Sequence, residues 1–299
     1  MSLAVHSPIV RLGRTLLALL CACILALTSI QTRAQDFQTL CDQAAEAAAR
    51  DSLTQAAALL ERAIALEPGN PRNAILLSNL ATIQRRQELF LEAFDSYARA
   101  LELAPLATTI WMNRASLNLY LERYNQARED YTRALDLERD NQTALLMRAY
   151  IYMKQSDYSA ARADYRHLLR VAPFSYSGRL GYATLNRKMG RPEEALEILD
   201  GMLVRTRDLT AQSAKDRATV LTVRAGVLID LGRTESALLD LEEAISLDNT
   251  QAEAYLTRGQ IHLAQDRKDK AREDFQRAIA LGIPQEEVAG LLQECKSGK

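Results

Sequence analysis

The stretch of sequence that decides the fold is residues 111–137, WMNRASLNLYLERYNQAREDYTRALDL. In its first half, Trp111, Ala115 and Leu119 recur at the spacing of one helix face. In its second half a similar face begins at Ala127, and only a few residues separate the two faces. Two short amphipathic helices joined by a tight turn form a helical hairpin. Because neither helix can bury its apolar face alone, the hairpin must pack against something else.

Ala127 has an equivalent in six other places along the chain. Four of the six steps between these alanines are 34 residues long, and a fixed period of this length indicates a repeat architecture. A large residue follows each alanine after four positions, and a small residue precedes it by twelve. The alanines are Ala56, Ala93, Ala127, Ala161, Ala195, Ala237 and Ala271. The large residues are Leu60, Tyr97, Tyr131, Tyr165, Leu199, Leu241 and Phe275, and the small ones are Ala44, Ala81, Ala115, Ala149, Ala183, Ala225 and Gly259.

Three prolines, Pro68, Pro105 and Pro173, lie twelve residues after their alanines. Proline cannot continue a helix, so each marks a helix end, and the turn inside residues 111–137 is expected near Glu122.

In five copies a further large residue precedes the alanine by sixteen positions: Leu77, Trp111, Leu145, Leu221 and Tyr255. In five copies a second alanine follows by seven: Ala63, Ala100, Ala134, Ala244 and Ala278. The order of large, small, alanine, aromatic, alanine and proline at these spacings resembles the tetratricopeptide repeat family. The resemblance implies an all-α fold, a right-handed α-solenoid of about seven helix-turn-helix repeats with a C-terminal capping helix. Small residues in such a solenoid let helix axes approach closely.

The repeats and the N-terminal sequence together predict a division of the chain into six segments. Glycine and proline are few, which suits a helical chain. The insertion between the repeats is expected either to lengthen a second helix or to form a loop. The segments are a signal peptide at 1–34, a degenerate first repeat at 35–70, repeats at 71–204 of which the last is divergent, a polar insertion at 205–217, repeats at 218–284, and a capping helix and tail at 285–299.

The N-terminus has the pattern of a secretory signal peptide. Arg11 and Arg14 precede an apolar run of twelve residues, and a small-residue cleavage site ends at Ala34. The alternatives are an uncleaved membrane anchor and a lipoprotein acylated at Cys23. The mature protein is therefore expected in the periplasm or cell envelope of a Gram-negative bacterium, and it meets a membrane only if the segment is retained or Cys23 is lipidated.

Two cysteines, Cys41 and Cys295, remain in the mature chain. They fall in the first and last predicted helices of an elongated array, so we expect no disulfide between them.

No pattern in the sequence predicts an active site. His167 and His262 have no cysteine or histidine partner at metal-ligand spacing, and there is no glycine-rich phosphate loop. Residues 35–299 carry 34 Lys and Arg against 38 Asp and Glu, which argues against a nucleic-acid partner. We expect a protein that is not an enzyme, binds no cofactor, metal or small-molecule substrate, and acts on another protein.

Four arginines, Arg114, Arg148, Arg224 and Arg258, stand just before the small residue of a first helix. In one interpretation each arginine lays its stem along the seam of its hairpin. In the other, the guanidinium groups form a ladder that binds carboxylates of a partner.

In the family that the chain resembles, the first helices line an inner, concave groove. The resemblance places an apolar and aromatic patch there, and such residues are enriched at protein interfaces. A peptide or a helix of a partner is the expected ligand, with arginines at the edge. The alternative is a structural adaptor of an envelope assembly, which would bind through its ends or convex face. The predicted contact residues are Met112, Arg114, Ser116, Leu119, Tyr120, Leu146, Arg148, Tyr150 and Met153.

Overall fold

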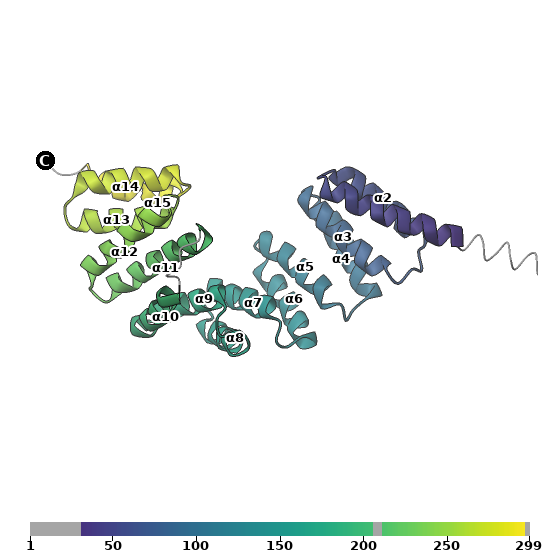
Figure 1. Ribbon diagram of the computed structural model, residues 1–299, viewed down its shortest axis with the longest axis horizontal. Coiled ribbons are helices and arrows are strands. Elements are labelled where there is room, and N and C mark those ends of the chain that lie inside the picture. The colour runs from purple at the N-terminus through teal and green to yellow at the C-terminus, as the bar shows by residue number, and fades with distance from the viewer. Residues whose placement is uncertain (1–30, 206–210, 297–299) are drawn as a thin grey trace, which may run out of the picture. The chain divides into compact units, whose positions relative to one another are not determined.

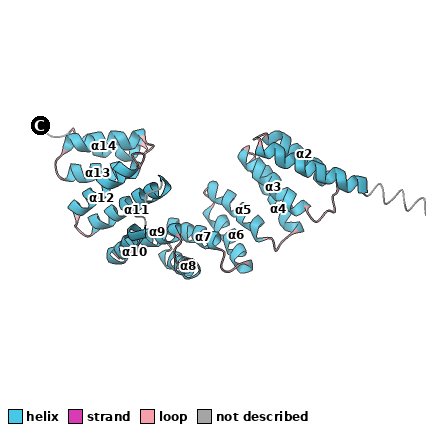
Figure 2. Ribbon diagram, viewed as in Figure 1, coloured by secondary structure: helices cyan, strands magenta, loops and turns pink. Residues whose placement is uncertain are grey.

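The computed structural model describes residues 31–205 and 211–296, and every regular element in these two ranges is an α-helix (Figures 1 and 2). The all-α prediction is thereby confirmed. The helices follow one another as hairpins, each made of a first helix, a turn and a second helix. The chain divides after Leu137 into two compact units, which are described separately.

Unit 1 contains two complete hairpins and the degenerate one that precedes them. Residues 31–49 are helical and pair with the next helix as the degenerate hairpin. Helix α3 packs on α4, α5 packs on α6, and the first helices α3 and α5 also contact each other. The helices of this unit are α2 (Leu53–Leu66), α3 (Asn73–Arg86), α4 (Phe90–Leu103), α5 (Thr108–Tyr120) and α6 (Tyr124–Leu137).

Unit 2 contains four hairpins and a final single helix. Each first helix packs on its second helix, and successive hairpins pack on one another. The helices are α7 (Gln142–Lys154), α8 (Tyr158–Val171), α9 (Tyr176–Lys188), α10 (Pro192–Arg205), α11 (Ala211–Asp230), α12 (Thr234–Leu247), α13 (Ala252–Ala264), α14 (Lys268–Ala280) and α15 (Gln285–Glu294).

The repeated alanines form the seam inside each hairpin. All seven have no exposed surface, and the large residues four positions later are at most 4 % exposed. The small residues of the first helices are equally buried. A methyl group at each crossing lets the two helices approach, and the large side chain fills the space beside it.

Every hairpin turn has the same backbone conformation. In residues 111–137 the turn residue is Glu122, with φ of 55°, which is the left-handed region. The Glu122 N–H donates to the Leu119 carbonyl and the Arg123 N–H to the Asn118 carbonyl, at 3.0 and 2.8 Å. This is the Schellman motif that ends a helix. The residues at this position in the seven turns are Asp51, Glu88, Glu122, Ser156, Gly190, Gly232 and Asp266.

The end of the polar insertion is neither part of the second helix nor a loop. Helix α10 keeps 14 residues, so the second helix is not lengthened. Helix α11 begins at Ala211 and has 20 residues, so the end of the insertion extends the following first helix. Residues 206–210 lie outside the described ranges. Residues 211–217 contain no glycine or proline, which is consistent with a helix that continues into the repeat at residue 218.

At its C-terminal end the repeat array is covered by a single helix. Helix α15 packs on α14 and α13 and buries Val288 completely, as expected of a capping helix. Cys41 and Cys295 are both buried free thiols. The apolar run and Cys23 of the predicted signal segment lie outside the described residues. None of the described helices combines the length and apolar character that a membrane crossing needs.

The left-handed turn predicts the effect of a single methyl group at Gly190. This residue has φ of 70°, and a Cβ there would meet no atom within 4 Å, so only backbone strain opposes Gly190→Ala. We expect the free energy of unfolding to fall by about 1 kcal/mol. Gly69→Ala is the control, since Gly69 has equal space and no positive φ. Urea unfolding followed by circular dichroism measures both, and equal effects would contradict the assignment of strain.

Candidate functional site

The predicted contact residues of unit 1 lie on α5. Tyr120 is 62 % exposed and Ser116 is also exposed, whereas Met112 and Leu119 are half-buried. The Tyr120 ring lies 5.9 Å from that of Phe90, measured between centroids. Tyr120 therefore presents an aromatic surface to solvent while one edge of its ring contacts a neighbour on α4.

The predicted contact residues of unit 2 lie on α7, and two of them serve the core. Leu146 and Met153 pack against the buried residues around Tyr165, whose hydroxyl donates to the Met153 sulfur at 3.5 Å. Tyr150 is 42 % exposed, and the Lys154 ammonium lies 5.6 Å from the centre of its ring. Tyr150 is therefore the accessible aromatic of this helix.

All four repeated arginines make the same contact inside their own hairpin. Each guanidinium donates from Nε and Nη2 to both oxygens of an aspartate sixteen residues later, at 2.6–3.0 Å. The aspartates are 3–6 % exposed. Such bidentate, charge-assisted pairs are the strong hydrogen bonds of proteins. The pairs are Arg114 with Asp130, Arg148 with Asp164, Arg224 with Asp240 and Arg258 with Asp274.

These pairs bear on the choice between the two interpretations of the repeated arginines. The hydrogen bonds to Asp240 are the main reason why the pKa of Arg224 is raised, and those to Asp274 raise the pKa of Arg258 in the same way. The structure thus supports the interpretation in which the arginine lies along the hairpin seam. Contact of Arg114 and Arg148 with a partner stays a prediction.

Sequence reasoning missed the aspartates, although a signal was present. An aspartate stands three residues after the repeated alanine in every copy that has the arginine. The three copies without the arginine lack the aspartate as well. The two positions hold Gln43 and Leu59 in the first copy, Leu80 and Ser96 in the second, and Tyr182 and Ile198 in the fifth. Reading the two positions together would have predicted the pairs.

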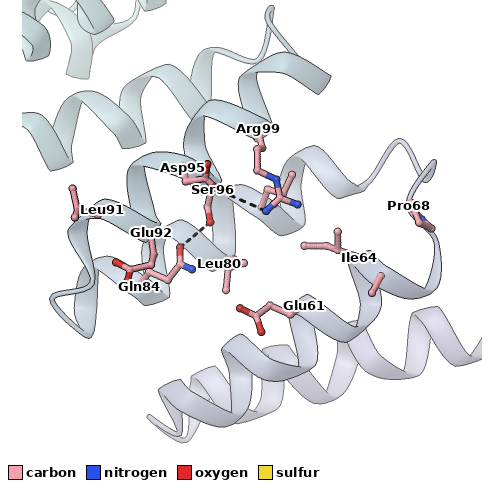
Figure 3. Close-up of a pocket in the computed structure, with 12 residues that line it drawn as sticks. Glu61, Ile64, Pro68, Leu80, Gln84, Leu91, Glu92, Asp95, Ser96 and Arg99 are labelled. Carbon is pink, nitrogen blue, oxygen red and sulfur yellow. Dashed lines mark hydrogen bonds and ion pairs between the residues drawn. The ribbon is translucent and has the colours of Figure 1, made fainter.

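A cleft of about 710 Å³ lies in unit 1 between the second helices α2 and α4, over the first helix α3 (Figure 3). Its charged lining consists of Glu61, Glu92, Asp95 and Arg99, of which Asp95 and Arg99 form an ion pair at 3.7 Å. In Figure 3 these side chains surround the opening from the α2 and α4 sides.

The floor of this cleft is mostly apolar, and it contains one hydrogen bond between two buried side chains. Leu80 is 3 % exposed, and Ile64 and Pro68 also line the cleft. The Ser96 hydroxyl donates to Gln84 Oε1 at 2.8 Å, so both buried groups are satisfied. At the rim Leu91 is 79 % exposed. Apart from Pro68, which marks a helix end, none of these residues belongs to the pattern that predicts the repeat.

The described residues offer few groups for chemistry. Among them, no three His, Cys, Asp or Glu side chains are grouped so as to hold a metal ion. Burial raises the pKa of Tyr131 and Tyr165 to about 12, so neither ionises near neutral pH. His262 is 7 % exposed in the core, and burial lowers its pKa while Asp274 acts in the opposite direction.

Comparison with family models identifies the repeat. The model described as tetratricopeptide repeat matches residues 41–108, 112–166 and 146–209, and two further models of that repeat match 218–251 and 252–282. No curated protein matches the sequence. The repeat that the alanine spacing predicted is confirmed.

Solved structures agree with the family models. A tetratricopeptide repeat protein from Parabacteroides merdae is 31 % identical, with a TM-score of 0.73 over 88 % of this chain and 100 % of that chain. The Pseudomonas aeruginosa protein pilF is 16 % identical, with a TM-score of 0.57 over 74 % of this chain and 96 % of that one. The APC/C hetero-tetramer Cut9–Hcn1 is 12 % identical, with a TM-score of 0.61 over 86 % and 55 %. The last two share the fold alone, and the prediction of an α-solenoid is confirmed.

The arginine–aspartate pairs predict a large cost for losing one partner. Replacement of Arg148 by Met would leave the buried Asp164 carboxylate unpaired, and we expect the free energy of unfolding to fall by about 3 kcal/mol. The double variant Arg148→Met/Asp164→Leu should recover most of this loss, because no buried charge remains. Chemical denaturation of the three proteins measures the effect.

A matched control comes from an exposed pair in unit 1. Arg133 and Asp136 lie 3.7 Å apart with both side chains more than half exposed. We expect Arg133→Met to change stability by less than about 0.5 kcal/mol. Equal losses for Arg133→Met and Arg148→Met would contradict a structural role for the buried pair.

Proposed function

The chain belongs to the tetratricopeptide repeat family, and from this premise we propose that it is an exported, non-enzymatic protein that binds a peptide or helix of a partner along its first helices. The fold is that of a scaffold for protein–protein interaction. Stacked hairpins expose a side chain at the same position in each repeat, and an extended or helical segment can contact several of them at once.

The observation that carries the proposal is the exposure of two tyrosines on first helices. Tyr120 on α5 is 62 % exposed and Tyr150 on α7 is 42 % exposed, although both are large aromatic residues. Tyrosine is enriched among the residues that dominate binding energy, because it provides a large contact area and a hydroxyl with little entropy to lose. Each tyrosine offers such an anchor within its own unit.

The arrangement of acidic groups supports a binding role over catalysis. The buried carboxylates Asp130, Asp164, Asp240 and Asp274 are each held by an arginine of the same hairpin. Their oxygens are engaged in the interior, so they are poorly suited to exchange protons with a substrate.

Export is proposed on the N-terminal sequence. The basic residues, apolar run and small-residue exit before Gln35 favour a cleaved signal peptide and a place in the periplasm or cell envelope of a Gram-negative bacterium. Retention of the segment as an anchor and acylation of Cys23 are the alternatives.

The second candidate function, a structural adaptor, is favoured by exposed leucines on second helices. Leu91 on α4 is 79 % exposed and Leu239 on α12 is 67 % exposed. Apolar side chains at such positions are available to a neighbouring subunit without involving the first helices.

The two candidate functions predict different effects of surface substitutions. The partner is a protein captured from envelope extract. We expect Tyr120→Ala/Tyr150→Ala to raise its dissociation constant at least tenfold, since each aromatic anchor contributes about 1–2 kcal/mol. Titration of the purified partner against protein of unchanged helicity gives the measurement.

Leu239→Ala is the matched control, because it removes an equally exposed side chain from a second helix. Affinity that survives the tyrosine substitutions and is lost with Leu239→Ala would replace the first candidate by the adaptor.

Export has its own test in the intact mass of protein purified from the producing bacterium. We expect the mass of residues 35–299, because a signal peptidase removes the segment that ends at Ala34. The mass of the whole chain would contradict cleavage, and an added diacylglycerol mass on a chain that starts at Cys23 would establish the lipoprotein instead.

A further inference from the structure

The cleft in unit 1 lies where other hairpins hold an arginine. In four hairpins an arginine of the first helix reaches an aspartate of the second helix, sixteen residues on. In the α3/α4 hairpin the same two positions are Leu80 and Ser96, and both line the cleft. No guanidinium enters the seam there from the chain's own first helix.

A carboxylate that serves such an arginine is nevertheless present. Arg224 Nη1 donates to Asp200, at 2.6 Å, on the second helix of the preceding hairpin. Asp200 stands five residues after its repeated alanine, and Glu61 of α2 holds this position before the α3/α4 hairpin. On α12 the same position is Glu242, which contributes to raising the pKa of Arg258 after the larger effect of Asp274. The position holds Ala98 before Arg114 and Thr132 before Arg148, so an acidic residue stands near the arginine in two of the four hairpins. Glu61 stands at this position before a hairpin that has no such arginine.

The remaining charges of the cleft favour a cation. Glu61, Glu92 and Asp95 face one guanidinium, that of Arg99, which is paired with Asp95. Within residues 31–205 and 211–296, neither Glu61 nor Glu92 has an ion-pair partner. The volume of about 710 Å³ lies within the range of about 300–1,000 Å³ that is typical of ligand pockets.

We propose that this cleft binds an arginine side chain of a partner protein, in the place that Arg114, Arg148, Arg224 and Arg258 occupy in their own hairpins. The guanidinium lies against Glu61, with Glu92 and Asp95 nearby, and the aliphatic stem lies on the accessible apolar lining at Ile64 and Pro68. An apolar residue next to the arginine packs on Leu91 at the rim. This site is made by second helices of unit 1 and is separate from the first-helix tyrosines of the proposed function.

Arginine fits this cleft better than lysine. Its planar guanidinium donates in two directions and is weakly hydrated, so it loses less on leaving water. The half-buried Ile64 in the cleft lining accepts the stem, as apolar surface does in the seams of the other hairpins. Lysine would bring a strongly hydrated point charge onto the same apolar floor.

The test uses a short probe peptide, acetyl-Gly-Leu-Arg-Leu-Gly-amide, titrated into the full protein by calorimetry. A second peptide carries citrulline, a neutral analogue of arginine with nearly the same shape. We expect the arginine peptide to bind at least about fivefold more tightly than the citrulline peptide, since one ion pair is lost. Absence of arginine-peptide binding, or equal affinities for the two peptides, would overturn the proposal.

Substitutions locate the binding. Glu61→Gln should lower the affinity for the arginine peptide about fivefold. Glu102→Gln changes an exposed position of α4 outside the cleft, and it should change that affinity by less than about twofold. Leu80→Arg/Ser96→Asp rebuilds the pair found in the other hairpins and should abolish binding while the protein stays helical.

Tyr120→Ala separates this site from the proposed function. We expect the peptide affinity to be unchanged in this variant, because Tyr120 is not part of the cleft lining. Loss of peptide binding in Tyr120→Ala, together with normal binding in Glu61→Gln, would assign the arginine to the first-helix surface and overturn the proposal for the cleft.

Discussion

The structure depends on the close approach of two helices at a small residue. The hairpin α13/α14 shows how tight this constraint is. Gly259 takes the place of the usual alanine, and a Cβ there would come within 2.7 Å of the Phe275 ring. The largest residue in the second helix is therefore matched by the smallest in the first. Because the alternation of small and large side chains sets the distance between the helices, the other features of each hairpin follow from it.

A second, polar layer lies beside this apolar seam. An aspartate buried to 3–6 % exposure would be costly alone, and the bidentate contact from an arginine offsets that cost. The arginine is long enough to leave the first helix and reach the second, with its stem on apolar surface. Where Leu80 and Ser96 replace the pair, the apolar seam persists and the hairpin still folds. The polar layer can therefore be lost without loss of the repeat, and the space it filled becomes available.

The repeat was readable from the sequence because each hairpin repeats one local solution. Pro68 lies two residues beyond the end of α2, and the turn falls at Glu122, as the spacing predicts. The partner of each arginine was also present in the sequence, but the two positions lie on different helices and were read separately. Met153 shows the limit of single-helix reasoning, since its contact with Tyr165 depends on the next helix. The cleft depends on three helices from two hairpins, and no single copy of the pattern contains it.

Hairpins that lack the arginine–aspartate pair differ in the charges that line the space beside them. The α9/α10 hairpin also lacks the pair, with Tyr182 and Ile198 in its place, and a cleft of about 350 Å³ lies there. Its lining includes Arg162 and Arg179 rather than a surplus of carboxylates, and the buried Arg162 Nε has no hydrogen-bond partner in the described part of the chain. A third cleft of the same volume is lined by Arg224 and by Asp200 of the preceding hairpin, although Arg224 also keeps its pair with Asp240. An intact pair therefore does not always close the space beside it. A cleft therefore lies at two hairpins that lack the pair. The charges on the neighbouring second helices determine the charge of a side chain that could bind in it. Because packing fixes the interior of every hairpin, these outer positions are where the copies are free to diverge.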